Sequence, residues 1–374
     1  MKIKIVHIIT KLELGGAQGN TIYTVSNLDK GKFDVTLICG RGGVLDEKTG
    51  EIDIVFIDDL VREISPLKDI KAFWKIYKII KEKKPDIVHT HSSKAGIIGR
   101  FASFFAGVKK IIHTYHGFGF NDYQNMFVKH FYILIEKISC LITERIIFVS
   151  KDNIKTALRY GIGKSTKYEL IRSGIKLSDY SNRKNYEFVK KLGIEKNNSV
   201  IISTVANLKP QKNPEDFYEV AKNIINSGYD AYFIYAGGGE RLEYFQNKAE
   251  LDKISRRVFF VGWVLKPFDV YSCSDIFILT SLWEGLPRSL VEAMSSGVVP
   301  VCYKTDGVND IIIDGANGFI VEQKNVKRMT DTVKKLIEEP KLLEKIKENV
   351  LKTDLSEFDI DFMVKKQEEL YLNL

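Results

Sequence analysis

Short apolar runs alternate with longer amphipathic stretches along the whole chain. The runs with the length and composition of strands are residues 2–10, 33–40, 52–58, 86–92, 109–117, 145–150, 199–208, 231–239, 257–263, 275–281 and 299–303. They are continuously apolar and lack the alternation expected of a sheet with one solvated face. This pattern is typical of parallel strands that are buried on both faces under helices.

The stretches between these runs have helical spacing. Residues 70–84 place apolar side chains on one side and lysines on the other. Residues 213–228 carry the signals of a complete helix, with Asn213 as the cap, Pro214 at the first position and Gly228 as the stop. The alternation of strands and helices predicts a doubly wound α/β fold.

The chain of 374 residues is long enough for two domains. Residues 176–198 are polar and contain no strand run, so the linker is placed there. We therefore predict a first domain over residues 1–178 and a second over residues 190–355. A final helix over residues 356–374 is expected to pack on the first domain.

Composition narrows the class of protein. Hydrophobic residues make up 44% of the chain and charged residues 28%, which is globular. The apolar runs are far shorter than the roughly 20 residues that a spanning helix needs. The cysteines lack the spacing of a zinc knuckle or redox motif, which favours a reducing, cytoplasmic setting. They are Cys39, Cys140, Cys273 and Cys302.

The net charge of +8 is unevenly spread. Residues 1–180 hold 29 Lys and Arg against 19 Asp and Glu, so the first half carries all the positive excess. A basic surface attracts phosphate groups on nucleic acid, anionic lipid or a small ligand. Lysine-rich helix faces that only keep the protein in solution explain the same charge equally well.

Two features of the first half follow strand runs, where ligands of doubly wound sheets bind. Gly15 and Gly16 form a tight turn before a helix, and the amides of such a turn can hold an anion. Four histidines, His89, His91, His113 and His116, lie at the ends of two strand runs. Such a cluster indicates a polar pocket in which imidazoles hydrogen-bond to phosphate or hydroxyl oxygens. Zinc is conceivable from residue type, but the spacing lacks a metal motif, so no metal is expected.

In the second half, Lys209 and Lys212 come after a strand run and before a helix, where they can meet a diphosphate. A solvated basic loop is the simpler alternative. Two further strand runs end in turns with small residues at Gly238 and Gly262.

The segment 281–297, SLWEGLPRSLVEAMSSG, holds two acids close to a helix start. Glu284 is expected in the loop and Glu292 inside the helix, with Pro287 in its first turn. The amides from Gly285 onward then lie at the positive end of the helix dipole and can hold a diphosphate. Because phosphate repels a carboxylate, acids there are better suited to gripping sugar or ribose hydroxyls. Paired acids can also cleave glycosides, and spacing alone does not decide between these uses.

Together these motifs resemble the family-4 glycosyltransferases of the GT-B type over nearly the whole chain. The most specific element is the E-G-L-P…E segment, with seven residues between Glu284 and Glu292. Gly-Gly-Ala at 15–17, H-T-x-H-G at 113–117, V-S-K at 149–151 and N-L-K-P-Q-K-N-P at 207–214 follow in the expected order. The resemblance implies two Rossmann-like domains facing a cleft. It also implies transfer of a sugar from a nucleotide-sugar, most often a UDP-sugar, with retention of configuration and without a metal or other cofactor.

The resemblance also implies roles for individual residues. Glu292 is expected to hold the ribose, Glu284 the donor sugar, Lys212 the diphosphate and His116 the sugar–phosphate junction. The donor site is completed by Gly15, Gly16, Asn207, Lys209, Gly238, Gly262, Gly285, Leu286, Pro287 and Leu290. The family usually has an Arg where this chain has Asn207, and Lys209 lacks the bidentate fork of an arginine. Asp310 stands where the family's usual acid lies, which is a milder change.

In this family the first domain meets the acceptor, here through His91, Lys94 and Phe118. Residues 118–142 are aromatic-rich and follow His116 directly. We hypothesise a lipid-linked or cell-surface glycan precursor as acceptor, and peripheral attachment to an anionic membrane on its inner face. The alternative is that these aromatic side chains belong to the core.

Three other functions remain open on the sequence. A UDP-sugar epimerase of the same architecture would act without an acceptor. A non-catalytic sugar-nucleotide-binding subunit is suggested by Asn207. Binding of nucleic acid is suggested by the pI of about 9.0, but no reading motif accompanies it, so no nucleic-acid partner is expected. A dinucleotide-dependent dehydrogenase is disfavoured because no G-x-G-x-x-G follows a strand.

Overall fold

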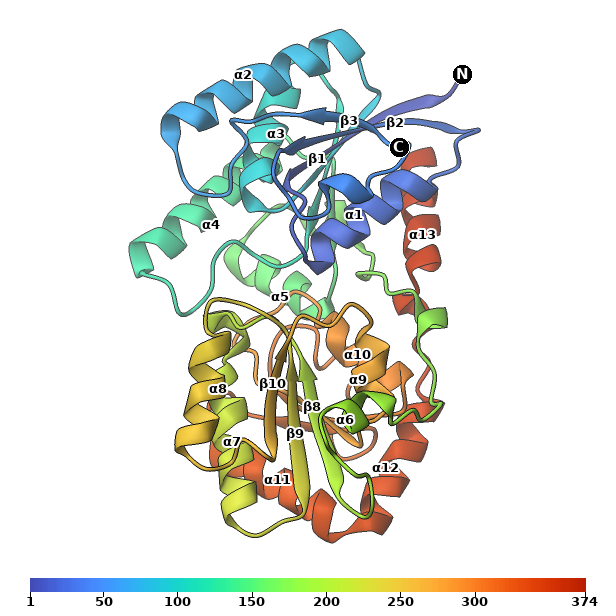
Figure 1. Cartoon of the computed structure of the whole chain (residues 1–374). Coiled ribbons are helices and arrows are strands. Elements are labelled where there is room, and N and C mark those ends of the chain that lie inside the picture. The colour runs from blue at the N-terminus through green and yellow to red at the C-terminus, as the bar shows by residue number, and fades with distance from the viewer. The chain divides into compact units, whose positions relative to one another are not determined.

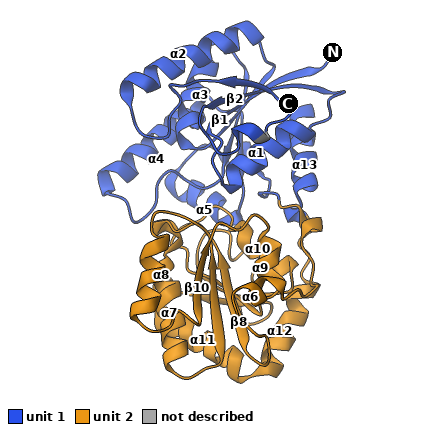
Figure 2. Cartoon of the chain, in the orientation of Figure 1, with its two compact units in different colours: residues 1–174, 357–374 blue, residues 175–356 orange. Residues whose placement is uncertain are grey.

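The computed structural model describes residues 1–374, apart from the side chain of Lys48. The chain divides into two compact units, which we call unit 1 (residues 1–174 and 357–374) and unit 2 (residues 175–356) (Figure 2). The sequence placed the corresponding boundaries at 178, 190 and 355. The chain thus enters unit 2 once, leaves it once, and ends in unit 1.

Unit 1 is built on one parallel sheet of seven strands. The strands are β1 (Ile3–Lys11), β2 (Phe33–Gly40), β3 (Asp53–Phe56), β4 (Ile87–His91), β5 (Lys110–Tyr115), β6 (Arg145–Phe148) and β7 (Tyr168–Leu170). Their order in the sheet is β3-β2-β1-β4-β5-β6-β7, so the order reverses between β1 and β4. This is the doubly wound arrangement that the strand runs predict.

Helices cover both faces of this sheet (Figure 1). They are α1 (Gly16–Asn27), α2 (Pro66–Lys83), α3 (Ser93–Phe105), α4 (Met126–Leu141), α5 (Lys151–Tyr160) and α13 (Ile360–Leu372). On one face, α2 and α3 pack against Val6 and Val88. On the other face, the last helix of the chain, α13, packs through Ile360 and Tyr371 among the sheet residues around Ile5. The C-terminal helix therefore completes the core of unit 1.

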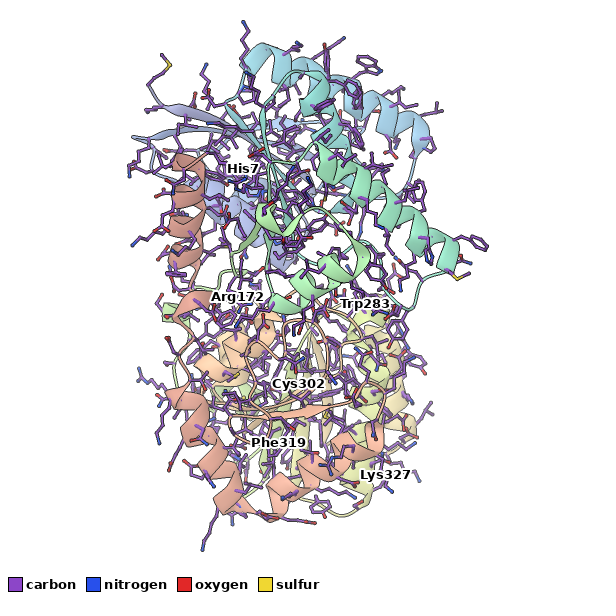
Figure 3. The ribbon with its side chains drawn as sticks, turned by 180° about the vertical axis from the view of Figure 1, so that it is seen from behind. His7, Arg172, Trp283, Cys302, Phe319 and Lys327 are labelled. Carbon is purple, nitrogen blue, oxygen red and sulfur yellow. The ribbon has the colours of Figure 1, made fainter. Side chains whose placement is uncertain are left out.

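Unit 2 repeats the plan with six parallel strands. They are β8 (Val200–Val205), β9 (Ala231–Ala236), β10 (Val258–Gly262), β11 (Ile276–Leu279), β12 (Val299–Tyr303) and β13 (Phe319–Val321). The order is β10-β9-β8-β11-β12-β13, with the reversal between β8 and β11. Cys302 and Phe319, on β12 and β13, mark this sheet in Figure 3. The helices are α6 (Glu187–Lys191), α7 (Pro214–Asn226), α8 (Leu242–Leu251), α9 (Pro267–Tyr271), α10 (Arg288–Ser295), α11 (Val326–Glu338) and α12 (Pro340–Lys352).

Two helices differ from the sequence prediction at their ends. Helix α2 starts at Pro66 and not at residue 70, because Ser65 and Pro66 occupy the positions that usually begin a helix. Helix α7 starts at Pro214 as predicted, but the Asn213 side chain does not cap it. Asn213 adopts a left-handed backbone with φ of 46°, and its side chain makes no capping hydrogen bond.

The sequence missed two strands, β7 and β13. Each has three residues and lies at the edge of its sheet. Three residues show no usable periodicity, and an edge position needs no continuous apolar run. The four cysteines are free and buried. Among the described residues, none of the helices has the length and apolar character needed to cross a membrane.

Candidate functional site

In unit 2, the loops after β8 and β11 meet at the point where the strand order reverses. This is where doubly wound sheets bind ligands, at the carboxyl ends of the strands. The Thr280 hydroxyl donates to the carbonyl of Lys212 at 3.0 Å. The Gln211 amide donates to the carbonyl of Trp283 at 2.7 Å, and the Leu282 amide donates back to the Gln211 carbonyl at 2.8 Å. These bonds hold the two loops side by side.

The result is a direct ion pair between two predicted site residues. The ammonium group of Lys212 contacts the carboxylate of Glu284. The two side chains are only 17% and 7% exposed, so little water screens the pair. The sequence assigned separate ligand groups to these residues, and in this structure they bind one another.

Glu292 lies inside α10, as expected, and is almost completely buried. Its carboxylate accepts a hydrogen bond of 3.2 Å from the Tyr271 hydroxyl. Burial raises the pKa of Glu292, and the neighbouring Arg288 charge and the bond from Tyr271 oppose that rise. Glu292 is therefore held in one place, with a carboxylate that gains from any further hydrogen-bond donor.

Helix α10 begins at Arg288, with Pro287 as its N-cap in an extended backbone conformation. The sequence analysis had placed Pro287 inside the first turn of this helix, so the observed helix starts one residue later than predicted. Leu286 and Leu290 are buried and anchor this helix start. A Cβ atom at Gly307 would lie 3.0 Å from the Gly285 carbonyl oxygen, so the following loop packs closely on this segment. The helix start is rigid, and its amides lie at the positive end of the helix dipole.

The remaining donor-site candidates lie at the ends of β8, β9 and β10. The Asn207 carbonyl accepts a bond of 3.1 Å from Tyr235, whereas its side-chain Oδ1 is buried without a hydrogen-bond partner among the described residues. Lys209 is exposed. A Cβ atom at Gly238 would lie 2.2 Å from the Trp263 indole nitrogen, and Gly262 forms a bridge with Gly237. Gly238 thus lies against the Trp263 side chain, and Gly262 has a φ of 73°, a left-handed backbone that favours glycine.

In unit 1, the strand register divides the histidines between the two faces of the sheet. His7 on β1 pairs in register with His89 on β4. His91 follows two residues later and therefore lies on the same face. His113 on β5 lies on the opposite face, where its Nδ1 is 2.9 Å from the Thr90 hydroxyl. The prediction that the four histidines form one cluster is therefore wrong for His113, which lies on the other face of the sheet. The prediction also omitted His7, which belongs to the cluster.

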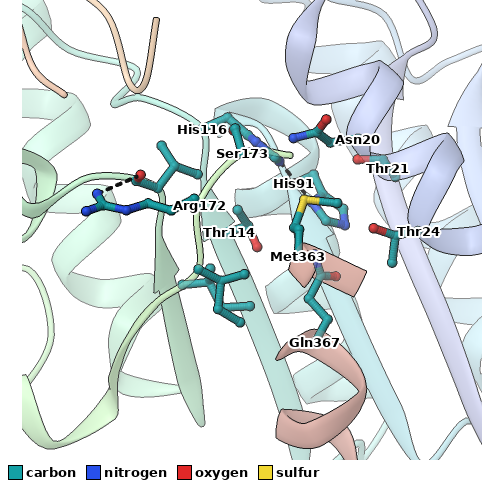
Figure 4. A pocket seen from close by; sticks show the side chains of 13 residues that line it. Asn20, Thr21, Thr24, His91, Thr114, His116, Arg172, Ser173, Met363 and Gln367 are labelled. Carbon is teal, nitrogen blue, oxygen red and sulfur yellow. Dashed lines mark hydrogen bonds between the residues drawn. The ribbon is translucent and has the colours of Figure 1, made fainter. Parts of the chain in front are cut away.

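The histidines on the α13 side form a connected hydrogen-bond network. His7 Nδ1 lies 3.0 Å from His91 Nε2, and His91 Nδ1 lies 3.2 Å from His116 Nε2. His89 lies between the Tyr371 hydroxyl at 2.6 Å and the Thr114 hydroxyl at 2.7 Å. A small hollow beside this network is lined by residues from α1, β5 and α13 and by the segment 171–173, and Figure 4 shows His91 and His116 at it.

Burial keeps these imidazoles neutral. It lowers the pKa of His7 to about 3 and lowers the pKa of His89, His91 and His113 as well. His7, His89 and His91 could each offer one nitrogen to a metal ion, with these atoms within 4.8 Å of one another. A metal would have to replace hydrogen bonds that the same nitrogens already make. That these three histidines bind no metal therefore stays a prediction.

The other candidates in unit 1 have mixed surroundings. Gly15 is the N-cap of α1 and Gly16 its first residue. Lys94 forms an ion pair of 2.6 Å with Asp69, so its charge is compensated within unit 1. Phe118 packs on Tyr115, with ring centroids 4.9 Å apart. This places Phe118 with the aromatic core, which is the alternative that the sequence left open.

The sequence analysis missed three residues at these sites: His7, Tyr271 and Tyr371. His7 lies inside its strand and not at the end, and Tyr371 is far from the histidines along the chain. A possible signal for His7 was its position two residues after Ile5, a buried position on the same strand face.

Two family descriptions match the chain and together cover most of it. The description "Glycosyltransferase Family 4" matches residues 14–179, and "Glycosyl transferases group 1" matches residues 185–353. The chain is 32% identical over 379 residues to the UDP-Gal:alpha-D-GlcNAc-diphosphoundecaprenol alpha-1,3-galactosyltransferase of Escherichia coli. That alignment covers 100% of this chain and 97% of the relative.

More distant relatives agree. The chain is 24% identical over 324 residues to the N,N'-diacetylbacillosaminyl-diphospho-undecaprenol alpha-1,3-N-acetylgalactosaminyltransferase of Campylobacter jejuni, with 82% of each chain covered. Among solved structures, Anabaena HepE in complex with UDP and glucose superposes with a TM-score of 0.83 at 17% identity, covering 100% of both chains. From the motifs, the two doubly wound sheets and these similarities, the chain belongs to the family-4 glycosyltransferases of the GT-B fold.

Proposed function

We propose that this enzyme transfers a hexose or N-acetylhexosamine from a UDP-sugar to a hydroxyl group of a lipid-linked glycan diphosphate. The observation that carries the donor half is the site at the strand reversal of unit 2. There Lys212, Glu284 and the start of α10 lie together, with Glu292 one turn further on. The acceptor half is supported by two relatives whose names specify diphosphoundecaprenol substrates.

The ion pair of Lys212 and Glu284 suggests how the donor binds. A diphosphate brought to the start of α10 competes with Glu284 for the ammonium group of Lys212. Once Lys212 turns to the phosphate, the Glu284 carboxylate can accept hydrogen bonds from sugar hydroxyls. Binding therefore replaces one ion pair by a cation–phosphate contact and a carboxylate–hydroxyl contact, and the buried charges remain compensated.

The chemistry then needs few side chains. As the sugar–oxygen bond breaks, negative charge grows on the diphosphate of UDP. Lys212 and the amides at the start of α10 stabilise that charge. The acceptor hydroxyl attacks from the face that UDP leaves, and a phosphate oxygen takes its proton, which retains the configuration. Neither step calls for a metal ion.

Helix α4 offers a surface for the membrane on which a lipid-linked acceptor resides. Five apolar side chains repeat along it at spacings of four and three residues and are all exposed. They form what we call the α4 stripe: Phe127, Phe131, Leu134, Ile138 and Leu141.

On α2, Leu67, Ile70 and Trp74 are also exposed, next to several lysines. Apolar stripes beside lysines are typical of helices that lie in an anionic membrane interface. We propose peripheral attachment to the inner membrane face, with the enzyme otherwise in the cytoplasm.

A transfer assay tests the reaction. The purified enzyme is incubated with UDP-galactose, UDP-glucose or UDP-N-acetylglucosamine and a synthetic N-acetylglucosamine-diphospho-lipid, and products are read by mass spectrometry. One UDP-sugar is expected to yield a disaccharide lipid. Turnover of a UDP-sugar without the lipid would indicate an epimerase instead. Donor binding without turnover in either assay would indicate a binding subunit.

A flotation assay tests the membrane contact separately. Vesicles containing anionic lipid are expected to carry the enzyme at low salt, and vesicles of neutral lipid to carry much less. The double variant Phe131→Ser, Ile138→Ser should lose flotation while keeping donor binding. Equal flotation of this variant and the wild type would contradict the role of the α4 stripe.

A further inference from the structure

The segment through which the chain enters unit 2 is fastened to the end of α9. We call residues 175–186 the connecting segment. The amide of Asn185 donates to the Ser272 carbonyl at 3.2 Å, and the Ser272 hydroxyl donates back to the Asn185 carbonyl at 3.2 Å. The ammonium group of Lys184 donates to the Ser274 carbonyl. Ser272 and Ser274 directly follow α9, which packs on α10 (Figure 1). The connecting segment is therefore tied to the helix pair that carries Tyr271 and Glu292.

Tyr180, in the middle of the connecting segment, packs against α9. A short 3-10 turn precedes it, and its amide donates to the Leu177 carbonyl at 3.0 Å. Its ring centroid lies 6.5 Å from that of Phe268 and 6.1 Å from that of Tyr271, both on α9. These contacts hold the Tyr180 ring beside the residue whose hydroxyl already binds Glu292.

Two tyrosine hydroxyl groups thus meet at the Glu292 carboxylate. The Tyr271 hydroxyl lies 3.2 Å from Glu292 Oε2, and the Tyr180 hydroxyl is a second hydrogen-bond partner of the same carboxylate. Burial and the charge of Glu292 raise the pKa of both tyrosines, so both hydroxyls keep their hydrogens at neutral pH. Because an ionised carboxylate has no hydrogen to give, both tyrosines donate to Glu292.

The remaining capacity of this carboxylate matches a ribose. An ionised carboxylate has about four acceptor positions on its two oxygens. Tyr180 and Tyr271 fill two of them, so two are left, and a ribose presents two neighbouring hydroxyl groups that can each donate. A carboxylate that two rigid rings already hold loses little conformational freedom when such a ligand binds.

We propose that Tyr180, on the connecting segment, acts with Tyr271 to position the Glu292 carboxylate for the two ribose hydroxyls of the donor nucleotide. Both tyrosines are positioning residues, since they act through Glu292 and need not touch the nucleotide. The connecting segment is thereby part of the donor site. The proposal rests on the proposed function, because it takes ribose binding by Glu292 from there.

Binding of two uridine nucleotides to the full chain tests this role. Isothermal titration calorimetry compares UDP with 2′,3′-dideoxyuridine diphosphate, which lacks both ribose hydroxyls. Tyr180→Phe removes one hydroxyl and keeps the ring that packs on Phe268 and Tyr271. It should weaken UDP binding by about 3- to 10-fold, the value of one hydrogen bond, and leave binding of the dideoxy nucleotide unchanged. In the transfer assay the donor KM should rise by the same factor while kcat stays constant.

The outcomes separate the proposal from the function on which it rests. If the wild type binds both nucleotides equally, or neither, Glu292 does not hold a ribose and the proposed donor site fails. If the wild type prefers UDP and Tyr180→Phe binds UDP as tightly, the donor site stands and the role of Tyr180 is overturned. Equal weakening of both nucleotides would reduce Tyr180 to a structural support.

A double-mutant cycle shows whether Tyr180 acts through Glu292. In the background of Glu292→Ala, Tyr180→Phe should cause no further loss of UDP affinity. A loss as large as in the wild type would place the action of Tyr180 elsewhere.

The matched control is Tyr186→Phe, at the end of the same connecting segment. The Tyr186 ring packs against the cluster that contains Val189 and Ile194. Burial and the charge of Asp275 raise the pKa of its hydroxyl, and Glu292 takes no part. This variant should bind both nucleotides like the wild type, and a loss of UDP affinity equal to that of Tyr180→Phe would contradict the proposal.

Discussion

Mild acid should unfold unit 1 before unit 2. Four buried histidines of unit 1 have a lowered pKa, and that of His7 falls to about 3. In the unfolded chain a histidine has a pKa of about 6.5. Between these values the unfolded chain binds protons that the folded chain does not, so stability falls as the pH falls. This loss of stability is absent above about pH 7, and it grows as the pH falls toward the pKa of the folded state.

The size of the effect can be estimated from His7. A histidine that stays neutral in the folded state lowers the free energy of unfolding at pH 5 by about 2 kcal/mol relative to neutral pH. His89, His91 and His113 shift in the same direction and are equally buried. Their combined effect of several kcal/mol is comparable to the whole stability of an ordinary domain, about 5–15 kcal/mol.

Unit 2 serves as the internal control because it contains no histidine. Its buried Glu292 has a raised pKa, so protonation at lower pH favours the folded state, which is the opposite sign. Hydrogen exchange measured by mass spectrometry between pH 7 and pH 5, corrected for intrinsic rates, separates the two units. Peptides of β1, β4 and β5 should lose protection while those of β8, β11 and β12 keep it. Equal protection of the unit 1 strands at both pH values would refute the reasoning.

Four substitutions test the donor site and the core. Lys212→Ala should lower kcat by about 10²- to 10³-fold in the transfer assay, because the charge on the leaving UDP loses its cation; a wild-type kcat would remove Lys212 from the site. Glu292→Ala should raise the donor KM, with Glu284→Gln as a comparison that affects sugar preference more than nucleotide binding; an unchanged KM in Glu292→Ala would contradict ribose binding. Glu136→Ala should cost about 3–5 kcal/mol in urea unfolding, because it leaves the buried Arg100 charge without its partner; a loss below 1 kcal/mol would show that the pair is not buried in solution.

The repeating pattern of the sequence was sufficient for the architecture. Continuous apolar runs identified the long central strands, since each of these is buried on both faces. The short edge strands β7 and β13 escaped, because three residues carry no period. The start of α2 was misplaced because Pro66 was not recognised as its first residue.

For the site, the sequence identified residues but not their partners. The E-G-L-P…E segment led to Glu284 and Glu292, yet the pairing of Glu284 with Lys212 depends on two loops that only the sheet brings together. The histidines were grouped by strand ends, whereas the register sorts them by face and separates His113 from the rest. Long-range contacts of this kind leave no trace in local spacing.

The return of α13 to unit 1 has a consequence for synthesis. Unit 2 is continuous in sequence, but the core of unit 1 lacks Ile360 and Tyr371 until the end of the chain has been made. At usual elongation rates, residues 175–371 take roughly 10–40 s to synthesise. For that time this face of the sheet is covered only in part, by helices such as α1, and the region around Ile5, His7 and His89 lacks the helix that packs on it. Nascent chains of this enzyme should therefore be chaperone clients through their first half, although that half is translated first.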